Sequence, residues 1–279
     1  MTIATGARPG VGELLRDWRS RRNRSQLDLS LDVGVSARHL SFVETGRSNP
    51  SPELVLALAD HLEVPLRERN TMLLAAGYAP RYSQRPLDDD AMVRARDSLQ
   101  RMLDAHDPYP GVVVDRSWNV LLANEAAFLF TEGVPAELLQ PTMNVFRLCL
   151  HPDGLAARTV NFADWATYLL RQMRRTIQLT DDAELRAVEQ EVRAYPNVAE
   201  LDEVHTAGHW DDPPLLVPLT ITTDPGTDTE GELSMFTTLT TFGTPLDVTL
   251  EELSLELFFP ADEATDRSLR GDRSMSSPS

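Results

Sequence analysis

The sequence lacks the features that mark membrane, secreted and thiolate-metal proteins. No apolar run approaches the roughly 20 residues that a membrane-spanning helix needs, and residues 1–15 contain no apolar core followed by a small-residue cleavage site. Cys149 is the single cysteine, which excludes an internal disulfide and a metal site built from thiolates alone. We therefore expect a cytoplasmic protein in a reducing compartment.

Lysine is also absent, so all 26 basic residues are arginines, against 43 acidic residues and a net charge of −17. The charge is divided unevenly along the chain. Residues 1–86 carry 12 arginines and 9 acidic residues, whereas residues 87–279 carry 14 arginines and 34 acidic residues. This asymmetry predicts a small module that faces a polyanion, joined to a larger acidic body. The length of 279 residues has room for about two domains.

The first part of the chain has the spacing of short, closely connected helices. Ser25 and Ser36 stand where N-caps are favoured, and Gly34 stands where a left-handed C-cap favours glycine. Apolar residues then recur at helical spacing on one side of each segment. The pattern predicts five helices, at about residues 13–22, 26–33, 37–45, 52–62 and 66–76.

The rest of the chain mixes both periodicities. The segment at residues 78–90 is polar and broken by two prolines, and it predicts a linker at residues 81–90, between a first domain at residues 1–80 and a second at residues 91–263. Residues 264–279 end in SMSSPS, and we expect them to form a disordered tail. Within the second domain the pattern predicts helices at 91–105, 124–130 and 162–195, the last broken near 180–182, and strands at 111–114, 118–123, 215–223, 233–242 and 253–259.

These elements predict an α+β protein, in which an all-α five-helix domain precedes a five-stranded antiparallel sheet with helices on one side, a PAS-like arrangement. The last strand alternates Leu253, Leu255, Leu257 and Phe259 with polar residues, Glu256 among them. That alternation is the period of a half-buried strand.

The helix, glycine turn and helix of residues 26–45 resemble the helix-turn-helix of the Cro/phage-repressor (XRE) family, and the resemblance covers about residues 11–77. It implies that the helix at 37–45 lies in the major groove of DNA. The outward residues of this helix would be the base contacts: Ala37, Arg38, Ser41 and Phe42. The residues at the start of helix 26–33 and after helix 37–45 would hold phosphates: Gln26, Arg47, Ser48 and Asn49.

Two of these positions have clear alternatives. Arg38 can take both acceptors of a guanine, or it can bind a phosphate. Phe42 can touch a thymine methyl group or pack against the loop at 47–50. For the phosphate candidates the alternative is ordinary capping and loop solvation. The resemblance also implies a pair between Glu44 and an arginine of the first helix, and Arg19 fits that place.

Two later segments, PYPGVVVDRSWNVLLANEAAFLF and TFGTPLDVTLEELSLELFFPAD, resemble the ligand-binding domain of MmyB-like transcription regulators. This resemblance implies a hydrophobic cavity between sheet and helices that takes a fatty-acid-like molecule. The candidate lining residues are Trp118, Phe128, Phe146, Trp165, Tyr168, Phe236 and Phe242, and the alternative for each is plain core packing. Arg147 or Arg171 would meet a carboxylate head, the alternative being a solvated surface role.

Other sites are less well supported by the sequence. His205 and His209 have a metal-ligand spacing, but Gly208 and the following prolines disfavour a helix there, and we expect no metal site or cofactor. Cys149 and His151, read as strand neighbours, lack an orienting third group. The sequence thus predicts no enzyme but a homodimeric, sequence-specific DNA-binding regulator. Alternatives are a second domain that only dimerises or binds a protein partner, and an enzyme anchored to DNA.

Overall fold

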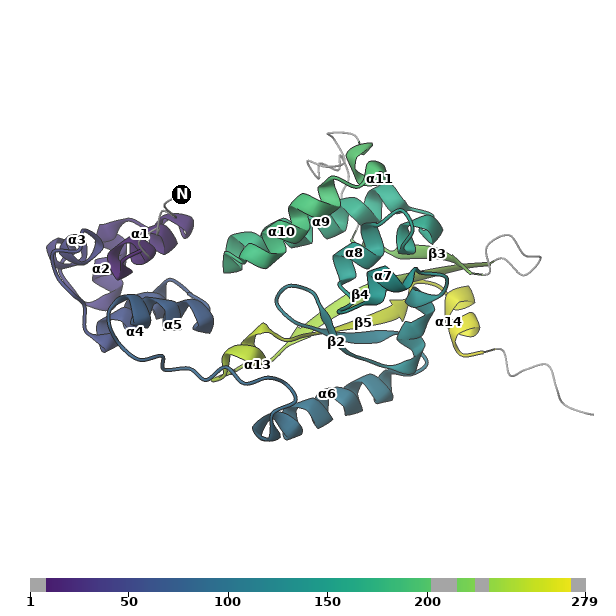
Figure 1. The fold of residues 1–279 in the computed structure, drawn as a ribbon, viewed down its shortest axis with the longest axis horizontal. Helices are drawn as coiled ribbons and strands as arrows, with labels where there is room; N and C mark the ends of the chain where they lie inside the picture. Colours follow the sequence, from purple (N-terminus) through teal and green to yellow (C-terminus); the bar gives the residue numbers. More distant parts are fainter. Residues whose placement is uncertain (1–8, 202–214, 224–230, 272–279) are drawn as a thin grey trace, which may run out of the picture. The chain divides into compact units, whose positions relative to one another are not determined.

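The computed structural model describes residues 9–201, 215–223 and 231–271. The chain divides into two compact units. Unit 1 comprises residues 1–85 together with residues 244–251, and unit 2 comprises residues 86–243 and 252–279. Figure 1 labels most helices and strands of the two units. In the part of the chain that the structure describes, no helix is both long and apolar enough to cross a membrane.

Unit 1 is built from five helices, as expected. Ser25 and Ser36 each accept a hydrogen bond from a backbone N–H three residues on, and Gly34 ends the second helix at a φ of 75°. Apolar residues from all five helices form its core, including Leu15, Trp18, Leu40, Leu58 and Met72. The helices are α1 (Val11–Arg21), α2 (Gln26–Val33), α3 (Ala37–Glu44), α4 (Pro52–His61) and α5 (Leu66–Ala75).

The contact between α1 and α3 depends on Gly12. A Cβ atom at this position would lie 2.3 Å from the carbonyl oxygen of Val43 and 2.8 Å from that of Glu44. Both oxygens belong to the backbone at the C-terminal end of α3 and cannot rotate away. A glycine therefore lets the two helices approach closely enough to pair side chains across their contact.

Unit 1 also contains residues 244–251, the connection between strands β4 and β5, which sequence analysis did not place there. The carboxylate of Asp247 accepts a hydrogen bond from the Ser83 hydroxyl at 2.7 Å, and the N–H of Val248 donates to the Ser83 carbonyl at 2.8 Å. Glu251, in α13 (Val248–Glu252), accepts the N–H of Leu66 at the start of α5 at 2.7 Å. These bonds fix the β4–β5 connection to α5 and to the segment that follows it.

The sheet of unit 2 has five antiparallel strands in the order β2-β1-β5-β4-β3, which confirms the expected sheet. The central strand, β5, pairs with β1 on one side and β4 on the other. Figure 1 shows the helices gathered around this sheet. The strands are β1 (Gly111–Val114), β2 (Val120–Ala123), β3 (Leu219–Thr223), β4 (Gly231–Thr241) and β5 (Ser254–Pro260).

The helices of unit 2 include the broken pair that the sequence predicted. The first ends at Asp181 in a left-handed conformation, and Asp182 caps the second by accepting the N–H of Leu185. The described helices are η1 (Asp90–Met92), α6 (Val93–His106), η2 (Glu125–Thr131), α7 (Ala136–Leu139), α8 (Val145–Leu150), η3 (Leu155–Arg158), α9 (Phe162–Thr180), α10 (Ala183–Arg193), α11 (Pro196–Ala199) and α14 (Glu263–Leu269).

Helices cover both faces of the sheet, so the expectation of helices on one side was wrong. On one face, the Phe259 ring of β5 meets His106 of α6 edge-on, with the ring centroids 4.8 Å apart. Figure 1 shows α6 on this side and α8 to α10 on the other. The expected half-buried strand was also wrong, because Leu255 and Glu256 point to opposite faces and are only 4% and 3% exposed.

The expectation of a disordered tail was wrong for residues 264–269, because Glu263–Leu269 form a helix. Asp262 caps α14 by accepting the N–H of Thr265. The buried Thr265 hydroxyl accepts the N–H of Ser234 in β4 at 2.9 Å, which docks the helix on the sheet. Residues 272–279 lie outside the described part of the chain.

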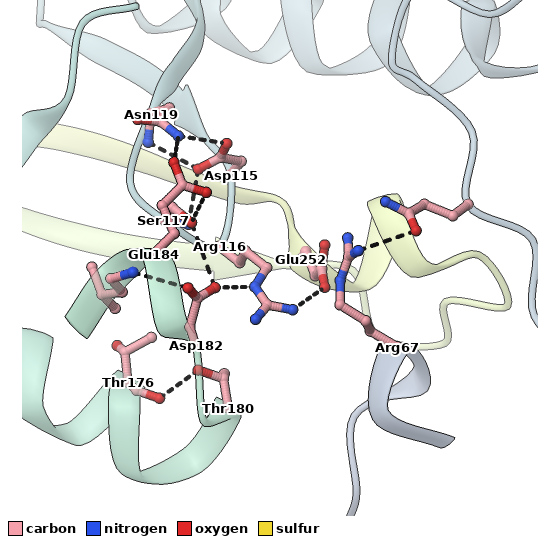
Figure 2. A network of polar contacts seen from close by, with 12 residues as sticks. Arg67, Asp115, Arg116, Ser117, Asn119, Thr176, Thr180, Asp182, Glu184 and Glu252 are labelled. Carbon is pink, nitrogen blue, oxygen red and sulfur yellow. Dashed lines mark hydrogen bonds and ion pairs between the residues drawn. The ribbon is translucent and has the colours of Figure 1, made fainter. Parts of the chain in front are cut away.

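A polar network joins the β1–β2 turn to the corner between α9 and α10 (Figure 2). Arg116, in the turn, forms ion pairs with Asp182 and, at 3.0 Å, with Glu252. Asp115 accepts the backbone N–H groups of Ser117 and Asn119, each at 2.9 Å. These contacts fix the shape of the turn, and its buried aromatic residue, Trp118, packs in the core of unit 2.

Candidate nucleic-acid interface and effector cavity

Helix α3 exposes a basic and aromatic surface opposite its buried residues. Arg38 is exposed, and its guanidinium carbon lies 5.3 Å from the centre of the Phe42 ring. The guanidinium of Arg47 lies 5.8 Å from the same ring. Ala37 and Ser41 are partly exposed, at positions that share this side of the helix. The structure thus brings Arg38, Phe42 and Arg47 together.

The four phosphate candidates have different surroundings. The backbone N–H groups of Arg47 and Ser48 donate to the carbonyl of Phe42, so the loop folds back on the end of α3. The side-chain amide of Asn49 donates to the Ala76 carbonyl at 3.2 Å, and that of Gln26 donates to a Glu44 oxygen at 2.7 Å. Arg47 therefore presents an exposed charge, while the amide nitrogens of Gln26 and Asn49 have partners within the unit.

The buried carboxylate of Glu44 is held by three donors. Arg19 donates from Nε at 2.6 Å and from Nη2 at 2.9 Å, and this confirms the predicted pair. The hydrogen bond to Glu44 raises the pKa of Arg19, so the guanidinium remains charged. The third donor is Gln26, a phosphate candidate whose bond to Glu44 sequence reasoning did not predict. The network joins α1, α2 and α3 beneath the exposed surface and fixes the direction of α3.

Unit 2 contains an apolar cavity of about 30 Å³ between the sheet and the helices α8, η2 and η3. By the ~10–15 Å³ that one water molecule requires, this space holds roughly two waters. Glu256 is the one charged residue in its lining. The lining residues are Val112, Val120, Ala127, Phe130, Met143, Val145, Leu148, Cys149, Leu155, Leu219, Glu256 and Phe258.

The nine ligand-pocket candidates lie elsewhere, and none is among the residues that line this cavity. Three aromatic candidates, Trp118, Phe146 and Trp165, belong to the buried core, whereas Phe128 is 65% exposed. Phe236 stacks on Phe259, on the opposite face of the sheet from the cavity. The partly exposed Phe242 follows β4.

The polar candidates have surface positions. Arg147 forms an ion pair with Glu191 at 2.8 Å, and the pKa of Arg147 is raised by that hydrogen bond. Tyr168 and Arg171 lie together in an open depression on α9. These residues stay predictions for ligand binding, but the cavity itself offers a different polar group.

That group is Glu256, whose role sequence reasoning missed. It is 3% exposed, and its Oε2 atom has no hydrogen-bond partner in the described residues. Burial raises the pKa of Glu256 to about 7, against the opposing effect of a hydrogen bond from Thr237. The sequence did contain a signal for the burial of Glu256, namely Phe258, which lies two residues later in β5 and therefore on the same face of the strand. A large aromatic beside an apparently polar face indicates that this face is covered.

Two further sequence hypotheses concern metal and thiol chemistry. His205 and His209 lie outside the described residues, and within residues 9–201, 215–223 and 231–271 no cluster of metal-ligating side chains is found. Cys149 lies on α8 rather than on a strand, which corrects that expectation. Burial and the neighbouring Glu256 raise the pKa of the Cys149 thiol to about 12, so it is a protonated, apolar part of the cavity wall.

Comparison with known proteins connects this architecture to a family. Residues 95–271 match the MmyB-like transcription regulator ligand binding domain, which is more than half of the chain. The chain belongs to the MmyB-like transcription regulators. Residues 11–72 match a helix-turn-helix domain. A transcription regulator of this family therefore combines unit 1, with the exposed α3 surface, and unit 2, with the cavity.

Two curated relatives are also named as a transcriptional regulator. The transcriptional regulator ClgR from two strains of Mycobacterium tuberculosis, CDC 1551 and H37Rv, is 36% identical over 75 residues, which is 27% of this chain. The chain spans 64% of the length of these curated relatives. A solved RNA-binding Light-Oxygen-Voltage receptor aligns with 97% of this chain and 63% of its own, at 13% identity. The TM-score of this alignment is 0.24.

Proposed function

We propose that this MmyB-like regulator binds DNA sequence-specifically through α3. The observation that carries the proposal is the exposed cluster of Arg38, Phe42 and Arg47 above the Arg19–Glu44 pair. In the major groove, Arg38 would donate to both acceptors of a guanine, and Phe42 would lie against a thymine methyl group. Arg47 would hold a phosphate. A regulator of this kind acts in the cytoplasm, where its DNA is found.

The active form in this proposal is a homodimer. One short recognition helix reads too few base pairs to discriminate an operator from the rest of a genome. Two copies related by a two-fold axis would place their recognition helices about 34 Å apart, or at a multiple of that distance, on one side of the duplex. The operator would accordingly be a palindrome with half-sites at that spacing.

The proposed effector is a small hydrophobic molecule of the fatty-acid type, bound in the cavity of unit 2. Burying about ten methylene groups is worth roughly 8 kcal/mol, which supports micromolar affinity before ordering costs. Because the cavity measures about 30 Å³, a chain of that length needs the apolar walls to move apart. Binding of the effector would therefore change the structure of unit 2. The effector would act by binding more tightly to one of two conformations of the protein.

The β4–β5 connection is the proposed route by which that movement reaches the DNA-binding unit. Its residues 244–251 belong to unit 1, and the strands on either side of it belong to unit 2. A shift of β5 against β4 would pull on the bonds from Asp247 to Ser83 and from Glu251 to Leu66. In a dimer, a rotation of α5 would change the separation of the two recognition helices.

A salt titration of the full-length protein tests DNA binding. Log affinity should fall steeply with log salt concentration, because each neutralised phosphate releases counterions. Arg47→Ala should reduce the slope by about one. The matched control is Arg94→Ala, which removes an exposed arginine from unit 2 and should leave the slope unchanged. A wild-type affinity that is independent of salt would rule out the proposed function.

A further inference from the structure

The effector cavity has one ionisable group with an unused hydrogen-bonding atom. Glu256 projects from the central strand β5, and its Oε2 atom is buried with no partner in the described part of the chain. All the other lining residues are apolar apart from the thiol of Cys149. A buried polar atom without a partner is rare and costs free energy, so it needs an explanation.

Among the described residues, no positively charged side chain acts on the pKa of Glu256. The groups that act on it are Thr237 of β4, Cys149 of α8 and Tyr168 of α9. Burial is the main cause that raises the pKa of both Cys149 and Tyr168, so both keep their protons near neutral pH. Arg147, a candidate for a carboxylate head group, is instead paired with Glu191 at 2.8 Å.

The other buried glutamate of the described chain shows what structural burial requires. Glu44 receives hydrogen bonds from Arg19 and Gln26 and has no orphaned oxygen. Glu256 has no such set. A carboxylate in apolar surroundings either takes up a proton or accepts a hydrogen bond from a bound molecule. The cavity beside Glu256 offers space for such a molecule.

We propose that Glu256 anchors the head group of the effector, and that this head group carries a hydrogen on nitrogen or oxygen: an amine, an alcohol or an undissociated acid. The inference rests on the proposed effector function of the cavity and specifies its chemistry. A carboxylate anion would meet a second carboxylate and is disfavoured. A fatty acid is accepted only when one proton is shared between its head and Glu256.

This chemistry predicts opposite pH dependences for two ligands of equal size. Octylamine stays protonated between pH 6 and pH 8, and it requires the ionised form of Glu256. Octanoate stays ionised over that range, and it requires the protonated form. Because the pKa of Glu256 is about 7, each form changes about tenfold in population across the range. Octanol carries no charge and serves as the internal reference.

The test measures dissociation constants of these three probes for the full-length protein by isothermal titration calorimetry at pH 6 and pH 8. From pH 6 to pH 8, octylamine should tighten about tenfold, octanoate should weaken about tenfold, and octanol should change less than threefold. Glu256→Gln should abolish both pH dependences and weaken octylamine at least tenfold at pH 8. The control Glu137→Gln, an exposed acid of the same unit, should leave all three unchanged.

The contradicting results are distinct. Equal pH profiles for octylamine and octanoate in the wild-type protein would overturn the assignment of Glu256, while leaving an effector cavity in place. That comparison needs no variant, so it holds even if Glu256→Gln fails to fold. If none of the three probes binds the wild-type protein, the effector function itself fails and the head-group inference fails with it. DNA binding, measured separately by the salt titration, would be unaffected.

Discussion

Glu44 in unit 1 and Glu256 in unit 2 are equally buried, each with 3% of its surface exposed, yet their surroundings are opposite. Glu44 is held by Arg19 and Gln26 and joins three helices. Glu256 lies in an apolar cavity wall with one oxygen unpartnered. A complete set of partners makes the first glutamate part of the scaffold. An incomplete set leaves the second available to a ligand.

The largest effect should come from breaking the Glu44 network. Arg19→Ala leaves a buried carboxylate without its cation, which we expect to destabilise unit 1 by about 3 to 5 kcal/mol. The change is measured by urea denaturation of the full-length protein, followed by tryptophan fluorescence, to which Trp18 contributes the signal of unit 1. The control Arg24→Ala removes an exposed ion pair to Asp32 and should cost less than about 1 kcal/mol. Equal effects of the two substitutions would contradict the comparison.

The second experiment concerns Glu256, where removing the buried carboxylate should stabilise the fold instead of destabilising it. The folded state raises the pKa of Glu256 to about 7 from its ordinary 4.5, so its contribution to stability is complete below pH 4.5 and is lost as the pH rises through 7. The loss amounts to about 3 kcal/mol. Glu256→Gln should therefore stabilise unit 2 relative to the wild type at pH 8, and the gain should disappear at pH 4.5. Glu44→Gln should instead destabilise unit 1. A gain independent of pH would argue against a buried, ionisable Glu256.

A third substitution tests how Arg19 reaches Glu44. Gly12→Ala would place a Cβ atom 2.3 Å from the Val43 carbonyl oxygen and push α1 away from α3. We expect a loss of about 1 to 3 kcal/mol in unit 1. Gly10→Ala is the matched control, since nothing lies within 4 Å of its Cβ position. Should Gly12→Ala be as well tolerated as Gly10→Ala, the close helix contact would not be needed.

The smallest effect concerns the link between effector and DNA. Ser83→Ala removes one hydrogen bond to Asp247 in the β4–β5 connection, at a cost to stability of about 0.5 to 1.5 kcal/mol. The informative measurement is the ratio of operator affinities with and without octanol, which should move towards one. Ser98→Ala, which removes an exposed bond within α6, should leave that ratio unchanged. An unaltered ratio in Ser83→Ala would remove the connection from the proposed route.

Local signals explain why the helices of unit 1 were predictable. Ser25, Ser36 and Gly34 mark helix ends through bonds to residues close by in sequence, and each acts as expected. The Arg19–Glu44 pair also followed from a resemblance, although its third donor did not. The exposed Arg38 and the partly exposed Phe42 lie on the predicted surface, and their contacts with DNA stay predictions.

Features set by distant parts of the chain were not predictable in the same way. The alternation of apolar and polar residues around Glu256 predicted that one face of β5 is covered. The other face is covered as well, by α6, which lies about 150 residues earlier in the sequence. Residues 244–251 belong to unit 1 because of hydrogen bonds to Ser83 and Leu66, which no local pattern announces. The lining of the cavity likewise depends on how seven separate elements meet in space. Choosing aromatic residues as lining candidates from the sequence therefore identified residues of the core instead.

The most direct test of the central claim is the ratio of operator affinity to nonspecific DNA affinity for Arg38→Ala, measured with the full-length protein at one fixed salt concentration. If Arg38 reads a base, the ratio should fall at least fivefold, which corresponds to about 1 kcal/mol of lost discrimination. Nonspecific affinity should change little. An unchanged ratio would mean that the α3 surface does not select the sequence, and the proposed recognition would be wrong.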